Sequence, residues 1–148
     1  MLRTLLALLL GLGACVGTVM GIEMLGHAAY PAPAGLDPRN PDHIAAVMAA
    51  MPPAAFAWLA VAWMAGAFAG GLVAALVAHT ANRFVYVVPG LLVAAGTVMM
   101  AKIAPHPQWL LVVGIAGGPI AAWLGGMLGR KLRTPRAAAA GEWRGGLR

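Results

Sequence analysis

Four ionisable side chains have types and a spacing that could do chemistry in this chain. Glu23 and His27 are four residues apart, so a helix would place them on one face, within reach of a shared proton or cation. Lys102 and His106 lie at the corresponding places of a later apolar segment. A charged group in such a segment is costly unless it is paired or hydrated. We therefore expect an ion pair between Glu23 and Lys102, with both histidines at the outer surface, and a proton or ion relay through the same residues is the alternative.

A metal centre is a weaker interpretation of the same residues. Glu23 and His27 would need further ligands, and a mixed set of nitrogen and oxygen donors would suit zinc better than copper(I). The nine methionines fit ordinary apolar packing, because no MxxM series accompanies them. We therefore expect neither a metal site nor a cofactor. The further outer-side donors are His106, Asp37, Asp42 and His43.

The sequence contains no set of residues typical of an enzyme. Serine is absent, the single cysteine lies within an apolar stretch, and no Walker loop or dinucleotide fingerprint is present. No two carboxylates are placed to work as a catalytic pair. We expect a protein without enzymatic activity.

The elements that must position these side chains are long apolar helices. The chain is 61% hydrophobic and 9% charged, with a mean hydropathy of +0.83. Residues 5–25, 54–78, 84–103 and 109–128 are each long enough to cross a bilayer, which takes about 20 helical residues. The sequence predicts an all-α membrane protein with one four-helix domain over 1–134 and a basic, disordered tail over 135–148.

Basic residues indicate the orientation of these spans. Placing the N-terminus inside puts Arg3, Arg83 and six tail residues in the cytoplasm, against Arg39 and Lys102 outside, a split of eight to two. We expect both ends to be cytoplasmic and the tail to bind anionic lipid headgroups. The net charge of +6 comes with no nucleic-acid recognition module, so we expect no nucleic-acid partner. The six tail residues are Arg130, Lys131, Arg133, Arg136, Arg144 and Arg148.

The outer loop, residues 28–53, predicts a short helix after a proline-rich connector. Asn40 can cap it and Pro41 can open it, because a proline at the first position loses no hydrogen bond. Apolar residues then recur at helical spacing, which is typical of an amphipathic helix lying on the outer membrane surface. They are Ile44, Val47, Met48 and Met51.

An internal repeat relates the first and third spans. At an offset of 79 residues, 11–27 aligns with 90–106, and seven of the 17 positions are identical, His27 with His106 included. A tandem two-plus-two repeat would give both halves the same orientation and place Glu23 and Lys102 at equal depth. Chance identity in so biased a composition is the alternative.

Small residues recur every four positions in three of the four spans. Such stripes let helices approach closely in a bilayer, so we expect a tightly packed bundle. Pro89 and Pro119 should kink the third and fourth helices. The stripes are Gly13, Gly17 and Gly21 in the first span, Ala62, Gly66, Gly70 and Ala74 in the second, and Gly117, Ala121, Gly125 and Gly129 in the fourth.

The N-terminal stretch admits two alternatives to a retained span. Residues 12–15 resemble a lipoprotein signal ending at Cys15, but apolar residues continue for ten further positions instead of giving way to polar sequence. Cleavage at 32–34 is disfavoured by Pro33 and by the length of the apolar stretch. We expect the first span to be kept.

Several short motifs resemble a group of small four-helix bacterial inner-membrane proteins. The resemblance covers mainly the first half, and the group carries no established activity, so it implies a bacterial plasma-membrane location and no mechanism. We expect a non-enzymatic accessory, assembly or interaction protein, acting as a homo-oligomer or with another membrane protein. The alternative is a small carrier or channel for a proton, cation or small solute using Glu23, Lys102, His27 and His106. The motifs are 21–27 (Gly-Ile-Glu-Met-Leu-Gly-His), Tyr30-Pro31, 35–37 (Gly-Leu-Asp), Ala62-Trp63 and Gly70-Gly71.

Overall fold

Helices make up the secondary structure of the described part of the chain. The computed structural model describes residues 2–78 and 83–145, with side chains as far as Arg133. Its elements are α1 (Leu2–Ala29), a 3-10 turn (Pro41–His43), α2 (Ile44–Ala50), α3 (Pro53–Val77), α4 (Phe84–Ile103), α5 (Gln108–Val112), a π-helical turn (Val113–Gly117) and α6 (Gly118–Gly145). No strand occurs within these residues.

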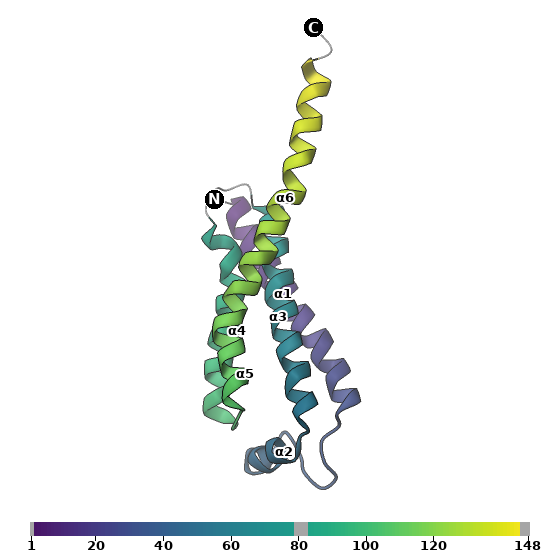
Figure 1. Ribbon diagram of the computed structural model, residues 1–148, viewed down its shortest axis with the longest axis vertical. Helices are drawn as coiled ribbons and strands as arrows, with labels where there is room; N and C mark the ends of the chain where they lie inside the picture. Colours follow the sequence, from purple (N-terminus) through teal and green to yellow (C-terminus); the bar gives the residue numbers. More distant parts are fainter. Residues whose placement is uncertain (1, 79–82, 146–148) are drawn as a thin grey trace.

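Four helical segments are long and apolar enough to cross a membrane, which confirms the four expected spans. They are Leu2–Ala29, Pro53–Val77, Phe84–Ile103 and Gln108–Arg133. Figure 1 shows the start of α1 and the end of α3 at one end of the bundle, and α2 with its flanking loops at the other. We call the end with α2 the loop end, and the end where α1 begins the termini end. The even number of spans brings the start of α1 and the end of α6 to the same side.

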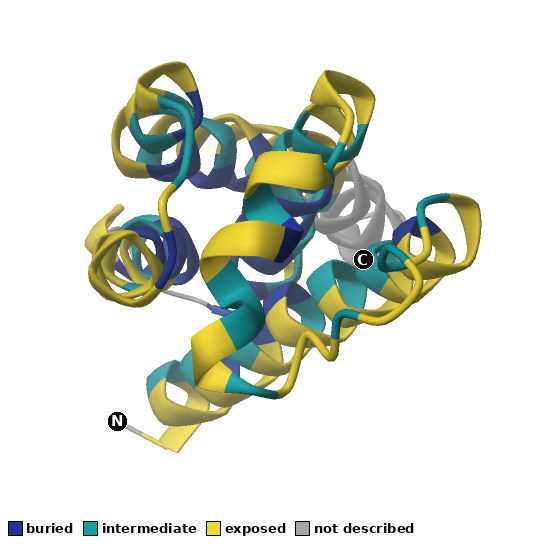
Figure 2. Ribbon diagram, turned by 90° about the horizontal axis from the view of Figure 1, so that it is seen from below, coloured by how far each residue is buried: buried dark blue, intermediate teal, exposed yellow. Residues whose placement is uncertain are grey.

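The third helix, α3, is the centre of the bundle. It packs extensively against α1 and α6, whereas α1 and α4 meet over a much smaller area and separate toward the loop end (Figure 1). In an apolar stretch of 18 residues within each helix, 44% of the residues are buried in α3 and 17% in α1. Seen from the loop end in Figure 2, buried residues face the middle of the bundle and the outward faces are exposed. The first helix is therefore peripheral, attached mainly through α3.

Glycines form the contacts that hold α3 in the centre. A Cβ on Gly70 would lie 2.8 Å from the carbonyl oxygen of Gly11 in α1, and one on Gly129 would lie 2.7 Å from that of Leu72. Gly66 and Gly125 make equally close contacts with α1 and α3, respectively. Helices that approach this closely gain van der Waals and weak CH···O contacts, which replace the missing hydrophobic drive between helices in lipid.

Three glycines of the expected packing stripes do not contact another helix of the chain. Around Gly13, Gly17 and Gly21 there is open space where a Cβ would stand, because this face of α1 points away from the bundle. The glycine of α1 that meets α3 deep in the bundle is instead Gly11. The recurrence of glycine was visible in the sequence, but which helix face meets a neighbour within the chain was not.

The contact between α4 and α6 is made backbone to backbone. A Cβ on Gly118 would lie 2.9 Å from the carbonyl oxygen of Gly90, and one on Gly90 would lie 2.7 Å from the Cα of Pro119. Pro119 has no N–H to donate to the carbonyl four residues before it, and the wider π-helical turn, Val113–Gly117, occupies that place. A rare helical turn therefore accompanies one of the two prolines expected to distort a helix.

The outer loop contains the expected short helical segment. The side chain of Asn40 accepts a hydrogen bond from the backbone N–H of Asp42 at 3.1 Å, and the segment opens with the 3-10 turn before continuing as α2. Val47 is buried, whereas the alanines on the opposite side of α2 are exposed. Its position on a membrane surface, like the tandem repeat, stays a prediction.

Beyond the four spans, the last described helix continues into the segment expected as a basic tail. The helix α6 continues to Gly145 and extends beyond the other helices in Figure 1. The run of alanines at 137–140 favours helix more strongly than any other residue type would. The side chains of Arg136, Arg144 and Arg148 lie outside the described residues.

The Gly90–Gly118 contact predicts a large difference between two glycines of α4. Replacing Gly90 by alanine should lower the free energy of unfolding in detergent by about 1–3 kcal/mol, because the new methyl group would press on backbone atoms that cannot rotate away. The matched control is Gly96→Ala, since nothing lies within 4 Å of that Cβ position. Equal stabilities of the two variants would contradict this account of the α4–α6 contact.

Candidate functional site

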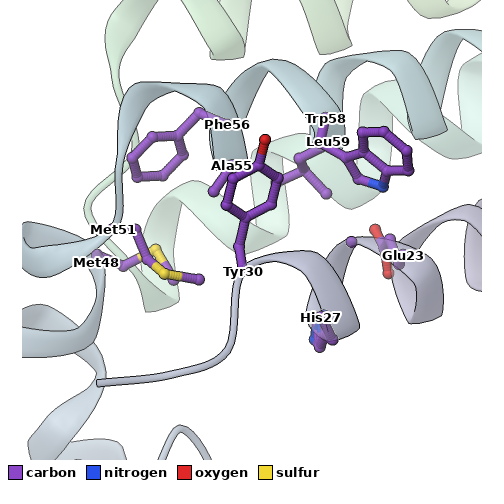
Figure 3. A pocket seen from close by; sticks show the side chains of 10 residues that line it. Glu23, His27, Tyr30, Met48, Met51, Ala55, Phe56, Trp58 and Leu59 are labelled. Carbon is purple, nitrogen blue, oxygen red and sulfur yellow. The ribbon is translucent and has the colours of Figure 1, made fainter. Parts of the chain in front are cut away.

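A small cavity lies beneath α2 at the loop end (Figure 3). Its volume is about 110 Å³, comparable to the roughly 150 Å³ of an apolar cavity that accepts benzene. The end of α1, the α2 segment and the start of α3 supply its walls. The lining residues are Glu23, Gly26, His27, Tyr30, Met48, Met51, Ala55, Phe56, Trp58 and Leu59.

Close packing between Gly26 and Trp58 fixes one wall of the cavity. The indole Nε1 of Trp58 donates a hydrogen bond to the carbonyl oxygen of Ile22 at 2.8 Å. A Cβ on Gly26 would lie 2.7 Å from that nitrogen, so only glycine leaves room for the ring. From the end of α1 the ring of Tyr30 reaches toward α3 (Figure 3). Neither Gly26 nor Trp58 was identified from the sequence as part of this wall.

The half-buried Glu23 carboxylate has partners on α1 and α3. Trp63 supplies a side-chain hydrogen bond, and His27 is close enough to interact with the carboxylate electrostatically. Trp63 is 7% exposed and belongs to the core, packed with Cys15 and Ala67. Glu23 is also the only acidic residue within the four spans. A tryptophan 40 positions away in the sequence gave no signal that it would serve as the partner.

Lys102 is not among the groups that act on the Glu23 carboxylate. It is exposed in the last turn of α4, and Figure 1 shows this end of α4 across α3 from the end of α1. The structure therefore does not bring together the two charges that the sequence analysis paired. The separation of α1 and α4 toward the loop end is the physical reason.

His106 lies in the loop between α4 and α5 and contacts the start of α3 next to the cavity. Its Nδ1 lies 2.8 Å from the carbonyl oxygen of Ala104, and its ring meets Phe56 edge to face at 6.4 Å between centroids. Phe56 lines the cavity, so His106 stands behind one of its walls. Of the four candidate residues, Glu23 and His27 lie together, His106 stands behind Phe56, and Lys102 is apart.

Two more hollows adjoin α1. One, of about 270 Å³, is an open groove on its surface lined by Met20, Glu23, Met24 and His27. Another, also of about 270 Å³, lies between α1 and α4 beside Cys15, whose thiol is 3.7 Å from the carbonyl oxygen of Pro89. Glu23 thus borders both the cavity beneath α2 and an outward-facing groove.

The cavity beneath α2 favours an apolar or positively charged occupant. Aromatic rings and thioethers line it, and the faces of aromatic rings attract cations. Within the residues that the structure describes, no three His, Cys, Asp or Glu side chains gather closely enough to hold a metal ion.

Comparisons with known proteins add no relative to this description. No family model matches the chain, and neither a curated protein nor a solved structure matches it.

The position of Lys102 predicts that its charge contributes little to the fold. Lys102→Gln should change the free energy of unfolding in detergent by less than about 0.5 kcal/mol, as is usual for exposed side chains. Glu23→Lys is the comparison, because it places a positive charge beside His27 and removes the acceptor for Trp63. If Lys102→Gln lowered the free energy of unfolding as much as Glu23→Lys does, Lys102 would have to pair with Glu23, and this description of the site would be wrong.

Proposed function

We propose that this chain is a non-enzymatic protein of the bacterial inner membrane that works by assembling with a second copy of itself through the outward face of α1. Both ends lie in the cytoplasm in this proposal, which rests on the split of basic residues, eight against two. The observation that carries the assembly role is the unoccupied space around Gly13, Gly17 and Gly21.

These three glycines differ from the stripes inside the bundle. Gly66 and Gly70 already meet α1, and Gly125 and Gly129 already meet α3, so their close-packing surface is used within one chain. The stripe on α1 has the same spacing without a neighbour. It therefore offers the surface through which transmembrane helices pair.

A second copy fits this surface because the stripe is self-complementary. In a two-fold dimer the same patch meets itself, and the GxxxG spacing allows two such helices to cross with their backbones close together. Val16 and Met20 lie along one side of the glycines and are 44% and 58% exposed, so a partner helix can contact them there. Only 17% of the residues in the apolar stretch of α1 are buried, so this face is accessible to a partner.

A carrier or channel is the second candidate, favoured by one observation. Glu23 borders both the cavity beneath α2 and the groove on α1, so a proton or cation could reach it from the loop end. Deeper in the bundle, the buried side chains of Trp63, Cys15 and Ala67 pack together. We prefer the assembly role because it needs no path through this packed region.

Self-association should depend on Gly17 and leave the fold intact. Gly17→Val should weaken association about tenfold, equivalent to about 1.4 kcal/mol, because the branched side chain would hold the two helices apart. The measurement is energy transfer between labelled copies diluted in lipid vesicles. Thermal unfolding of the same variant should stay at the wild-type value, since the Cβ enters open space within one chain.

Two controls separate assembly from folding. Gly96→Val also places a Cβ in open space, but on α4, and should leave association unchanged. Gly70→Val should unfold the bundle, because its Cβ would lie 2.6 Å from the Cβ of Pro89. A chain that remains monomeric at every lipid dilution, or that associates equally well with Gly17→Val, would overturn the proposed function.

A further inference from the structure

A basic hollow lies at the termini end, away from the cavity beneath α2. Its volume is about 280 Å³, and it lies between the start of α4 and the middle of α6. The lining residues are Arg83, Tyr86, Trp123, Met127, Arg130 and Lys131. Arg83 comes from a turn far from the C-terminal basic cluster in the sequence, so folding brings three cations of two separate segments to one hollow.

The three cationic groups give this hollow a strong preference for anions. Among the described residues no acidic side chain lines it, and the nearest acidic residue of α6 in the sequence is Glu142. Arg133 does not line the hollow, and one of its guanidinium nitrogens donates to the carbonyl oxygen of Ala75 at 3.1 Å, near the end of α3. Guanidinium and ammonium groups bind phosphate oxygens through charge-assisted hydrogen bonds.

The other walls indicate that the phosphate belongs to a lipid. Trp123, Met127 and Lys131 follow one another at intervals of four along α6, so an apolar strip runs into the basic end of the same helix face. Trp123 and Met127 are 41% and 38% exposed, and Tyr86 closes the inner wall with 1% exposure. A phospholipid matches this arrangement, because its acyl chains would lie beside the apolar strip and its phosphate beside the cations.

We propose that this hollow is a binding site for an anionic phospholipid, whose headgroup phosphate is held by Arg83, Arg130 and Lys131 while an acyl chain lies along Trp123 and Met127. The site goes beyond general attraction of a basic tail to a membrane, because it uses a residue from the start of α4. It is independent of pairing through α1, which uses another surface. Basic pockets between transmembrane helices bind headgroups in this manner.

The test measures lipid binding to the full chain in maltoside detergent by native mass spectrometry. Dioleoyl-phosphatidylglycerol should bind more tightly than dioleoyl-phosphatidylcholine. Arg83→Gln should reduce that preference about fivefold, the loss expected for one basic residue at a membrane surface. Arg3→Gln is the matched control, since it removes the same charge at the same end of the bundle without lining the hollow, and it should keep the preference.

Two further arms define what would overturn the site. Arg83→Lys keeps the charge and should retain most of the preference; a loss as large as that of Arg83→Gln would show a structural role and contradict the proposal. Glycerol phosphate represents a soluble phosphate without acyl chains and should not displace the lipid at equal concentration. Displacement by it, equal binding of the two lipids, or equal effects of Arg83→Gln and Arg3→Gln would each overturn the lipid site.

Discussion

The rest of the structure depends on how closely these helices can approach one another in a solvent as apolar as their own side chains. Lipid offers no gain for burying leucine or valine, so the contacts must come from backbone surfaces that fit together. Glycines provide those surfaces between α3 and its neighbours, and between α4 and α6, where Gly90 and Gly118 meet backbone to backbone. Because α3 carries contacts on several sides, it occupies the centre, and α1 is left with one face unused.

The same packing explains where the polar groups lie. The helices α1 and α4 separate toward the loop end, so aromatic side chains and α2 fill the space that glycine contacts no longer close. Glu23 stands at this transition, with Trp63 and His27 beside it in place of an oppositely charged residue from α4. At the termini end, the α4–α6 contact brings Arg83 toward the basic part of α6. The two ends therefore differ in charge, and the cavities at them suit different occupants.

Sequence patterns predicted the elements well and the contacts between them poorly. Length and hydropathy identified four spans, and Asn40 before Pro41 identified the start of the outer helical segment, because these signals are local. Local patterns do not specify which face of a helix meets which neighbour. Two facts could therefore not be read from the sequence: the glycine stripe on α1 faces outward, and the partner of Glu23 is a tryptophan on α3. The helical propensity of the alanine run at 137–140 accounts for the continuation of α6 to Gly145.

The exposed apolar faces of a membrane-spanning bundle must contact acyl chains. Spin labels at Leu9, Val98 and Ile120, which are 58%, 43% and 57% exposed, test this in phosphatidylcholine vesicles after Cys15 is replaced by alanine. Dissolved oxygen should relax all three labels strongly and a water-soluble nickel chelate should not, whereas a label at the exposed loop residue Arg39 should respond to nickel. Strong relaxation by nickel at Leu9, Val98 and Ile120 would contradict the membrane-spanning bundle.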